Sequence, residues 1–354
     1  MQAAEDRSEN LRLIRDSAAA IAPRQGDTKR IRALRFTEPG FDRAVWRQMA
    51  ELGWIGLRVA DEAGGSALGV SEFCTLAEEL GAGLVPEPLI PAALAAMLLP
   101  AAQAAAVLSG ERIVLPAWQE QPNSLDHAGT ARLAGGRITG RKTFIPMAAG
   151  ADAFLVSLPD GLALVERDAP GVVLTITQTQ DGGHYGTLTL TEAPAIALPG
   201  RMDALIEEAA LATGFALLGL MDRAFAITLD YMKTRQQFGR PIGSFQALQH
   251  RAVDLQIQIA LTRASLEEAA VTLDRSALPA GLRMATVSRA KARASDAAMI
   301  VTRAAIQLHG GIGYTDEYDI GLYLRKAMVL SGLYGNATLH RDRFRATAPD
   351  EDDE

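Results

Sequence analysis

A glycine cluster in the stretch IQLHGGIGYTDEY, at residues 306–318, is the first candidate for chemistry in this sequence. Gly310 and Gly311 carry no β-carbon, so a phosphate group could approach their backbone closely. A Rossmann-type glycine loop would follow a β-strand and open a helix. The preceding segment ASDAAMIVTRAAIQ has helical character instead, which excludes a Rossmann fingerprint. On the residues alone, a helix stop is the alternative role of the two glycines.

The elements that must position these glycines fall into three zones of different periodicity. Residues 9–108 show helical spacing, residues 113–198 consist of short apolar runs broken by turn signals such as PDG and DAPG, and residues 203–345 are helical again. In the last zone an apolar seam alternates spacings of three and four, as in a helix of an antiparallel bundle. The seam consists of Phe245, Leu248, Ala252, Leu255, Ile259, Thr262, Leu266, Ala269 and Leu273. This pattern predicts a helical domain, a small antiparallel β domain and a helical bundle.

The composition limits the classes of function. The chain has 354 residues, of which 48% are hydrophobic, and a net charge of −7. Its Lys and Arg residues are scattered, so no basic stripe is available to hold a nucleic acid. Cys74 is the single cysteine, which excludes an internal disulfide and a thiolate metal cage. Because no signal-peptide pattern and no run of 18 uncharged apolar residues occurs, we expect a cytoplasmic protein without a membrane, nucleic-acid or metal partner.

Two motifs of the last zone resemble the acyl-CoA dehydrogenase family in wording and order. They are YMKTRQQFGRPIGSFQALQHRAVDL at residues 231–255 and AIQLHGGIGYTDEY some fifty residues further on. WRQMAELGWIGLRVADEAGG at residues 46–65 is similar to that family's N-terminal signature, with Ala60 where a proline is usual. The resemblance covers nearly the whole chain. It implies an FAD-dependent enzyme that desaturates an acyl-CoA thioester between its α and β carbons, with electron-transfer flavoprotein as the acceptor.

The same resemblance implies a fold that is mainly α with a central β domain. Residues 1–112 would form the N-terminal helical domain, residues 113–200 the middle antiparallel β domain, and residues 201–346 a C-terminal four-helix bundle. The remaining residues, 347–354, form an acidic tail that we expect to be disordered, because it lacks apolar side chains.

The family's contacts to FAD match residues of this sequence. In the family, an R-x-x-F-G motif and a Q-x-x-G-G loop hold the pyrophosphate and adenosine half of FAD across a subunit interface. The matching positions are Arg235, Phe238, Gln307, Gly310 and Gly311, and the same groove would be lined by Ile242, Phe245 and Gln246. A guanidinium group can form bidentate, charge-assisted hydrogen bonds with a phosphate. The alternative for Arg235 is a solvated cation at a helix end, favoured by the helix dipole.

The positions of the family's catalytic base differ from the family pattern. Most members carry a glutamate in a Y-E-G-T turn after the glycine loop, and here that position is Tyr334, followed by Gly335. A phenol with a pKa of about 10 is a poor base at neutral pH. Other branches carry the base on the first helix of the last zone, where this sequence has Ala209, with Ala210 in place of the adjacent arginine. The catalytic base is therefore unknown.

Glu207 and Glu208 stand next to the second base position. They are candidates for the missing base, although a step of one residue turns a side chain by about 100° around a helix. Their alternative role is structural, because acids in the first turns of a helix that follows Asp203 as N-cap stabilise the helix dipole.

The residues that would contact the flavin ring are also altered. The family's W-I-T/S segment matches Phe144 and Pro146 in RKTFIPMA, and proline offers neither a hydroxyl nor an amide hydrogen. Of the family's T-E-P segment, AWQEQP keeps Glu120, whose alternative role is that of a surface carboxylate.

The sequence retains the family's contacts to FAD, whereas the positions of the base and of the flavin-ring contacts are altered. Three functions are compatible with this difference. The chain resembles the two-subunit acyl-CoA dehydrogenases of steroid side-chain degradation, in which unlike chains form an α2β2 heterotetramer. The leading hypothesis is therefore a subunit that supplies FAD contacts to a partner carrying the base. The alternatives are a self-sufficient homotetramer whose base is not placed, and a non-catalytic assembly protein on the same scaffold.

Overall fold

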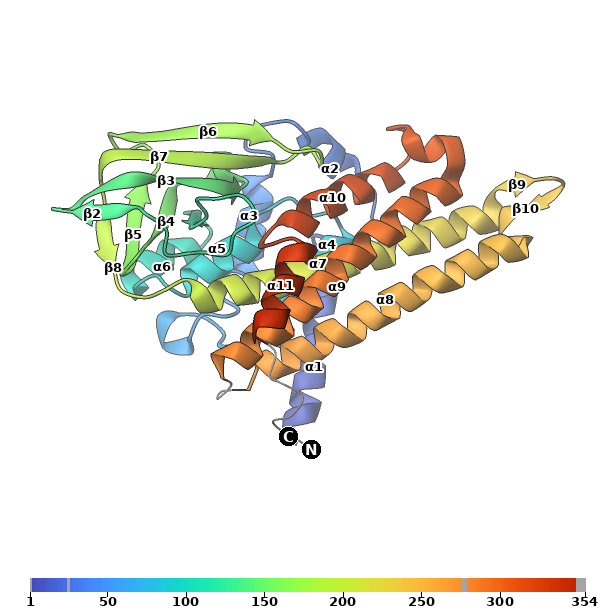
Figure 1. The fold of residues 1–354 in the computed structure, drawn as a ribbon, viewed down its shortest axis with the longest axis horizontal. Coiled ribbons are helices and arrows are strands. Elements are labelled where there is room, and N and C mark those ends of the chain that lie inside the picture. The colour runs from blue at the N-terminus through green and yellow to red at the C-terminus, as the bar shows by residue number, and fades with distance from the viewer. Residues whose placement is uncertain (1, 24–25, 276–278, 348–354) are drawn as a thin grey trace. The chain divides into compact units, whose positions relative to one another are not determined.

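A computed structural model describes residues 2–23, 26–275 and 279–347 of the chain (Figure 1). The described residues group into two compact units. The helical unit comprises Met1–Thr28, Val70–Val85 and Ala210–Glu354, and the sheet unit comprises Lys29–Gly69 and Pro86–Ala209. The predicted division at residues 112, 200 and 346 stays a prediction. The acidic tail predicted from residue 347 onward lies outside the described residues except for Thr347, which ends the last helix.

The sheet unit contains two four-stranded sheets, with strand orders β1-β4-β5-β8 and β2-β3-β7-β6. The strands are β1 (Val114–Ala117), β2 (Arg132–Ala134), β3 (Arg137–Pro146), β4 (Ala153–Leu158), β5 (Gly161–Glu166), β6 (Val172–Gln178), β7 (His184–Pro194) and β8 (Ile196–Leu198). β1 pairs with β4 in parallel, so the predicted antiparallel pairing is wrong for this one pair and right for the others in both sheets. The unit also contains the helices α2 (Lys29–Leu34), α3 (Arg43–Glu51), η1 (Asp61–Ala63), α5 (Leu89–Ala96), α6 (Ala101–Leu108) and η2 (Ala148–Gly150).

Helices, most of them long, make up most of the helical unit (Figure 1). They are α1 (Gln2–Ala18), α4 (Val70–Ala82), α8 (Gln246–Leu273), α9 (Ala280–His309), η4 (Gly310–Tyr314), α10 (Ile320–Gly332) and α11 (Ala337–Thr347), together with most of α7 (Asp203–Thr234). α8, α10 and α11 all pack against α9. By length and composition α7 could cross a membrane, but 89% of its most apolar stretch is buried, as in the core helix of a compact unit.

The apolar seam predicted on α8 is confirmed from Ala252 onward, whereas Phe245, which precedes the helix, and Leu248 are only half-buried. Ala252, Leu255, Ile259, Thr262, Leu266, Ala269 and Leu273 are all buried. α9 is a helix up to His309, which confirms that the glycines follow a helix end rather than a strand.

Glycines allow α4 and α7 to pack closely. A β-carbon at Gly81 would collide with the backbone of Ala216, and one at Gly219 would collide with the carbonyl group of Glu78. Because backbone atoms cannot yield as a flexible side-chain end can, these two positions require glycine. Cys74, which lies on α4, is buried.

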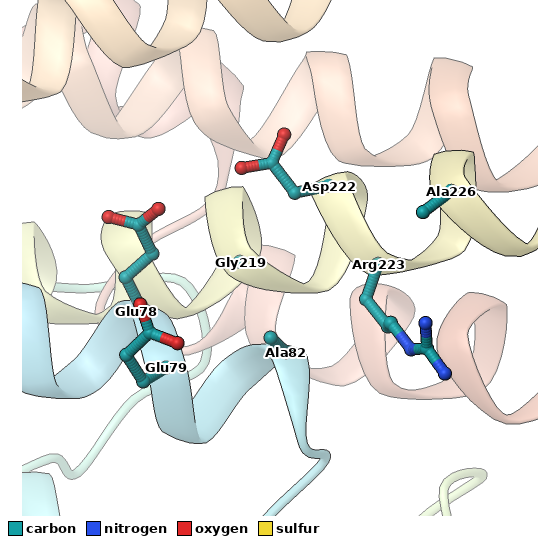
Figure 2. Close-up of a pocket in the computed structure, with 7 residues that line it drawn as sticks. All are labelled: Glu78, Glu79, Ala82, Gly219, Asp222, Arg223 and Ala226. Atoms are coloured by element: carbon teal, nitrogen blue, oxygen red, sulfur yellow. The ribbon is translucent and has the colours of Figure 1, made fainter. Parts of the chain in front are cut away.

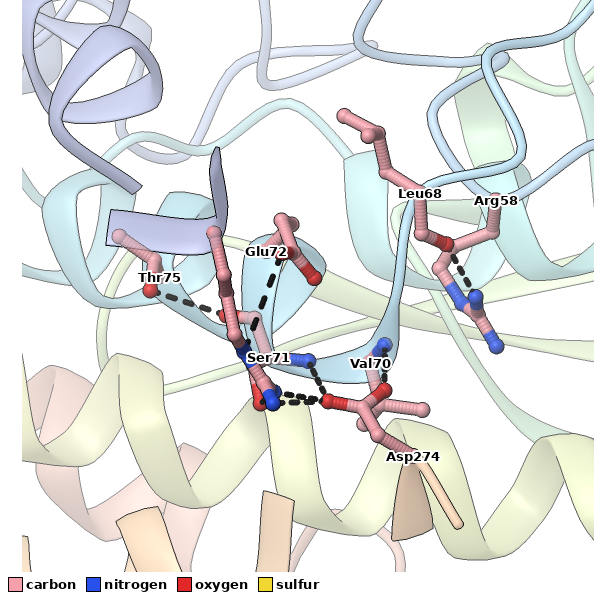
Figure 3. A network of polar contacts seen from close by, with 8 residues as sticks. Arg58, Leu68, Val70, Ser71, Glu72, Thr75 and Asp274 are labelled. Carbon is pink, nitrogen blue, oxygen red and sulfur yellow. Dashed lines mark hydrogen bonds and ion pairs between the residues drawn. The ribbon is translucent and has the colours of Figure 1, made fainter. Parts of the chain in front are cut away.

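Arginines from neighbouring helices neutralise the buried acids of α4. Arg263 of α8 lies 2.7 Å from Glu78, and Arg15 of α1 lies 3.7 Å from Glu79. At the start of α4, the Asp274 carboxylate accepts a hydrogen bond from the backbone nitrogen of Val70 at 2.6 Å, thereby capping the helix (Figure 3). These contacts tie α1, α4 and α8 into one packed unit.

Candidate FAD contacts and base positions

All eight predicted FAD contacts lie in the helical unit, and all are exposed or half-buried. They are Arg235, Phe238, Ile242, Phe245, Gln246, Gln307, Gly310 and Gly311. Two short strands, β9 (Gln236–Gln237) and β10 (Arg240–Pro241), form a hairpin between α7 and α8, followed by η3 (Ile242–Ser244). The R-x-x-F-G motif therefore occupies the tip that joins two long helices (Figure 1).

Phe238 and Gly239 form the two-residue turn of this hairpin. Both have positive φ angles, +54° and +77°, as a tight hairpin turn of this length requires. An aromatic residue in the left-handed region is strained, and the Phe238 side chain is also 91% exposed. Strain combined with an exposed aromatic ring is typical of a functional position.

A stacked pair of rings joins the ends of α7 and α9. The Tyr231 hydroxyl donates to the carbonyl oxygen of His309 at 3.2 Å, and the two rings stack with centroids 4.4 Å apart. Tyr231 lies one turn before Arg235, and His309 directly precedes Gly310. The structure therefore brings the two predicted FAD motifs to the same end of the helical unit.

The glycine pair fits a group that approaches the backbone. A β-carbon at Gly310 or Gly311 would meet no atom within 4 Å, so the space beside both residues is open. Gly310 has φ +65° and ψ −141°, a conformation that is almost restricted to glycine. Open backbone at the same end of the helical unit as Arg235 matches the chemistry of a pyrophosphate, so these residues fit the anionic half of FAD.

Arg235 and Arg240 are the cations of the hairpin. Within residues 2–23, 26–275 and 279–347, no carboxylate lies within ion-pair distance of either guanidinium group, whereas nearby Lys233 pairs with Asp230 at 3.3 Å. The Arg240 guanidinium carbon lies 4.2 Å from the ring centroid of Phe245. Sequence reasoning missed Arg240, because its contact with a residue five positions later leaves no signal in the sequence.

Tyr334, at the first base position, is buried and has a φ of +56°. Its carbonyl oxygen lies 2.8 Å from Nε2 of His340, whose Nδ1 lies 3.2 Å from the Ser288 hydroxyl. Burial and the nearby Lys291 lower the pKa of His340 to about 3. A neutral imidazole that donates through Nε2 and accepts through Nδ1 satisfies both contacts.

Lys291 binds backbone carbonyl groups of the same turn. Its ammonium group donates to the carbonyl oxygens of Leu330 at 3.2 Å and Gly335 at 3.2 Å, and to that of Ser331 at 3.3 Å. Two of these carbonyls belong to the last turn of α10, where backbone acceptors lack partners within the helix. Burial lowers the pKa of Lys291 to about 7. The turn thus keeps a fixed backbone although no carboxylate stands at residue 334.

The second base position has no carboxylate either, because residue 209 is an alanine. Ala209 is buried in α7. The neighbouring Glu208 forms a bidentate pair with Arg58, with distances of 2.5 Å to Nε and 3.1 Å to Nη2. Arg58 also donates to the carbonyl of Leu68 (Figure 3). Both side chains are buried, and the dipole-stabilising role considered for Glu207 and Glu208 stays a prediction. Asp203 is the first residue of α7 rather than its N-cap.

Phe144 and Pro146 lie at the end of β3 in the sheet unit. Phe144 has a φ of +57°, lies within a register shift between β3 and β7, and is 37% exposed. Its ring meets the edge of Tyr185 at 6.0 Å. The strand therefore presents an aromatic ring in a strained conformation, as expected for a functional position.

Glu120 is not the surface carboxylate that the sequence allowed. It lies 2.9 Å from the ammonium group of the fully buried Lys142 and accepts a hydrogen bond from the Thr130 backbone nitrogen at 2.7 Å. Burial opposes ionisation of Glu120, but the hydrogen bonds from Lys142 and Thr130 outweigh it and lower the pKa. Its role in this unit is to neutralise a buried lysine.

A pocket between α4 and α7 does not fit an anionic cofactor (Figure 2). Its volume is about 190 Å³, and its charged lining consists of Glu78, Glu79, Asp222 and Arg223. Arg263 pairs with both Glu78 and Asp222. Because this pocket is small and its acids already pair with arginines, the open glycine backbone and the hairpin arginines are the better candidates for phosphate contacts.

The fold and the residues at this end of the helical unit define a flavoprotein dehydrogenase, and the chain belongs to the acyl-CoA dehydrogenase family. Residues 8–105 match the N-terminal domain of acyl-CoA dehydrogenases, and residues 201–347 match the C-terminal domain. As a member of this family, the chain is an FAD-dependent oxidoreductase.

Individual relatives are similar over nearly the whole chain. Acyl-CoA dehydrogenase IpdE2 of Mycolicibacterium smegmatis is 33% identical over 337 residues, which cover 93% of this chain and 95% of the relative. A solved structure of a Tcur3481-Tcur3483 steroid acyl-CoA dehydrogenase variant has a TM-score of 0.84 and 32% identity, and covers 97% of this chain and 98% of that one. The ChsE4-ChsE5 complex from Mycobacterium tuberculosis has a TM-score of 0.84 and 25% identity, and covers 97% of both chains.

Proposed function

We propose that this chain is one subunit of a heteromeric acyl-CoA dehydrogenase, and that it supplies FAD contacts to a partner subunit that carries the catalytic base. The observation that carries this proposal is the solvent exposure of most of the predicted FAD contacts. Phe238 is 91% exposed at the tip of a hairpin, and Arg235, Gln307, Gly310 and Gly311 are exposed as well. Residues placed in this way suit a cofactor seated mainly in another chain.

The residues at the chain's own base positions support the proposal that a partner subunit carries the base. Desaturation requires a carboxylate that takes the α-proton of the thioester. When bound, FAD supplies the acceptor for the β-hydrogen. Tyr334 and Ala209 occupy the two positions where the family carries its glutamate, and Glu208 is engaged by Arg58. A partner with a glutamate at one of these positions would supply the missing proton acceptor.

An apolar stripe on α8 supports a subunit interface. Val253, Ile257 and Leu261 recur at intervals of four, so they share one face of the helix. Their exposed fractions are 56%, 48% and 54%. Apolar side chains aligned on one face of a long helix are typical of a surface that another subunit covers.

The relatives suggest the substrate class. Two of the similar structures are described by pairs of proteins, and one of these is a steroid acyl-CoA dehydrogenase. We therefore propose acyl-CoA thioesters of steroid side chains as substrates, electron-transfer flavoprotein as the electron acceptor, a heterotetrameric assembly and a cytoplasmic location.

Flavin content and activity test this proposal. The chain is purified alone and after co-expression with a candidate partner, namely an acyl-CoA dehydrogenase-like chain that carries the glutamate. We expect a colourless, inactive chain alone, and a yellow complex with one FAD per unlike pair whose flavin is bleached by steroid side-chain acyl-CoA. Turnover by the chain alone above about 1 s⁻¹, with one FAD per chain and insensitive to Glu207→Gln and Glu208→Gln, would contradict the proposal. Absence of FAD from both preparations would indicate an assembly protein.

A further inference from the structure

We propose that Arg240 is a further recognition residue of the hairpin, and that it contacts an adenosine diphosphate group with a guanidinium held in place by Phe245. Both FAD and acyl-CoA contain this group, so either molecule could be its source. The inference rests on the proposed function, in which the hairpin faces a neighbouring subunit. It adds a residue and a chemical role that the family motifs do not assign.

The geometry of three side chains carries the inference. The Arg240 guanidinium lies over the ring of Phe245 at 4.2 Å from its centroid. The Phe238 ring meets Phe245 edge to face, with centroids 6.1 Å apart and planes at 90°. A guanidinium above an aromatic face is attracted by the ring's electrons, which limits its rotamers before any ligand arrives. The three groups therefore form one ordered cluster on an exposed turn.

The backbone beneath this cluster is rigid. The Ile242 nitrogen donates to the Arg235 carbonyl at 2.8 Å, and the Gln249 side chain donates to the Gly243 carbonyl at 2.9 Å. A β-carbon at Gly243 would lie 2.9 Å from the carbonyl oxygen of Met232, so η3 packs directly on the end of α7. Because Phe245 follows η3 directly, these backbone contacts also fix the position of the ring that packs against Arg240.

The charge of the hairpin selects the ligand class. Neither Arg235 nor Arg240 has a carboxylate partner in the part of the chain that the structure describes. Two uncompensated guanidinium groups five residues apart favour a group with more than one negative charge, and each can bind a phosphate through two parallel hydrogen bonds. Phe238 offers an exposed ring on which a purine can stack. A diphosphate joined to a purine satisfies both features.

Binding measurements on the assembled complex test the inference. The complex of this chain with its partner is stripped of FAD, and dissociation constants are measured for FAD and, separately, for free coenzyme A. Arg240→Gln removes the charge and the planar fork, whereas Arg240→Lys retains the charge alone. Arg341→Gln is the matched control, because it removes the same charge from an exposed arginine that pairs with Asp296 on the same unit.

We expect Arg240→Gln to weaken binding of one of the two ligands by about tenfold to a hundredfold, and Arg240→Lys to weaken it less. The loss should shrink as the salt concentration rises, because an exposed phosphate contact is screened. Weaker FAD binding identifies FAD as the source of the adenosine diphosphate group, and weaker coenzyme A binding identifies the thioester substrate.

Two results would overturn the inference: neither ligand weakened by more than about twofold, within the scatter of surface substitutions, or an equal loss in Arg341→Gln. If the unmodified complex bound no FAD, the proposed function would fail, and the coenzyme A measurement alone would decide the role of Arg240. If FAD bound normally and did not depend on Arg240, only the present inference would fail.

Discussion

The imidazole of His340 lies 2.8 Å from the carbonyl oxygen of Tyr334 and joins two helices at the place where related enzymes carry a glutamate. His340 lies on α11, and its other ring nitrogen faces Ser288 of α9. Together with Lys291, this histidine fixes the backbone of a turn that has a tyrosine, Tyr334, at the predicted base position. The turn therefore contributes to the stability of the helical unit. Protonation of His340 should change that stability measurably.

We expect His340 to make stability depend on pH. Burial, followed by the charge of Lys291, lowers the pKa of its imidazole from 6.5 to about 3. Between these two values the unfolded chain binds a proton that the folded chain does not. The stability that is present above pH 6.5 is therefore lost as pH falls toward 3, by up to about 1.4 kcal/mol per pH unit from this side chain.

Urea unfolding at several pH values, on the native chain and on His340→Gln, checks this expectation. Glutamine can still donate to the Tyr334 carbonyl but does not titrate, so its stability curve should be flatter by about one proton. Parallel curves for the two proteins would mean that His340 does not titrate with folding.

Gly310 and Gly311 should respond differently to alanine. Gly310→Ala forces a β-carbon into a backbone with φ +65°, so we expect a loss of stability of about 1–3 kcal/mol. Gly311 has no positive φ and open space at its β position. Gly311→Ala should therefore leave the unfolding midpoint unchanged and weaken only FAD binding. A Gly311→Ala protein with normal FAD affinity would place the cofactor elsewhere.

Arg235→Ala should weaken FAD retention by the assembled enzyme by about 1.5–3 kcal/mol, because it removes a charge-assisted phosphate contact. Lys233→Ala serves as the control, since this exposed lysine of the same helix turn already pairs with Asp230. The FAD dissociation constant is measured by flavin fluorescence. An equal, small effect of both substitutions would show that Arg235 is only a cation at a helix end.

Glu208→Gln separates a structural acid from a catalytic one. The substitution removes the charge of a buried carboxylate that binds the Arg58 guanidinium through two contacts, so we expect a loss of stability of roughly 3 kcal/mol. Asp342→Asn breaks the exposed pair with Arg345 and should change stability by less than about 0.5 kcal/mol. Turnover of the assembled enzyme should stay within an order of magnitude. A fall of more than about a hundredfold would identify Glu208 as the base.

Local patterns predicted much of the fold. The spacing from Ala252 to Leu273 marked the buried face of α8, and the helical character of the segment before Gly310 excluded a Rossmann loop. The turn signals between residues 113 and 198 marked the strands. The parallel pairing of β1 with β4 was missed, because the two strands are separated by more than thirty residues and share no turn.

The site was predicted less completely, because its contacts join distant residues. Arg58 and Glu208 are 150 positions apart, and Lys291 reaches Gly335 across 44 positions. Neither pair leaves a periodic signal. Motif resemblance identified Arg235 and Phe238, yet it could not indicate that Arg240 folds back over Phe245. Which of the predicted contacts bind FAD stays a prediction.

The helical unit is assembled from three separate stretches of chain, namely Met1–Thr28, Val70–Val85 and Ala210–Glu354. The polypeptide changes unit after residues 28, 69, 85 and 209, so no single cleavage releases either unit intact. A gene fragment that encodes residues 201–347 would omit α1 and α4. It would leave the surface around Gly219 uncovered and Arg263 without Glu78. We expect such a fragment to be insoluble. A protein whose translation restarts before α7 would lack the same helices, and we expect it to fail to fold. Any truncation used to map subunit contacts must therefore retain the first 85 residues.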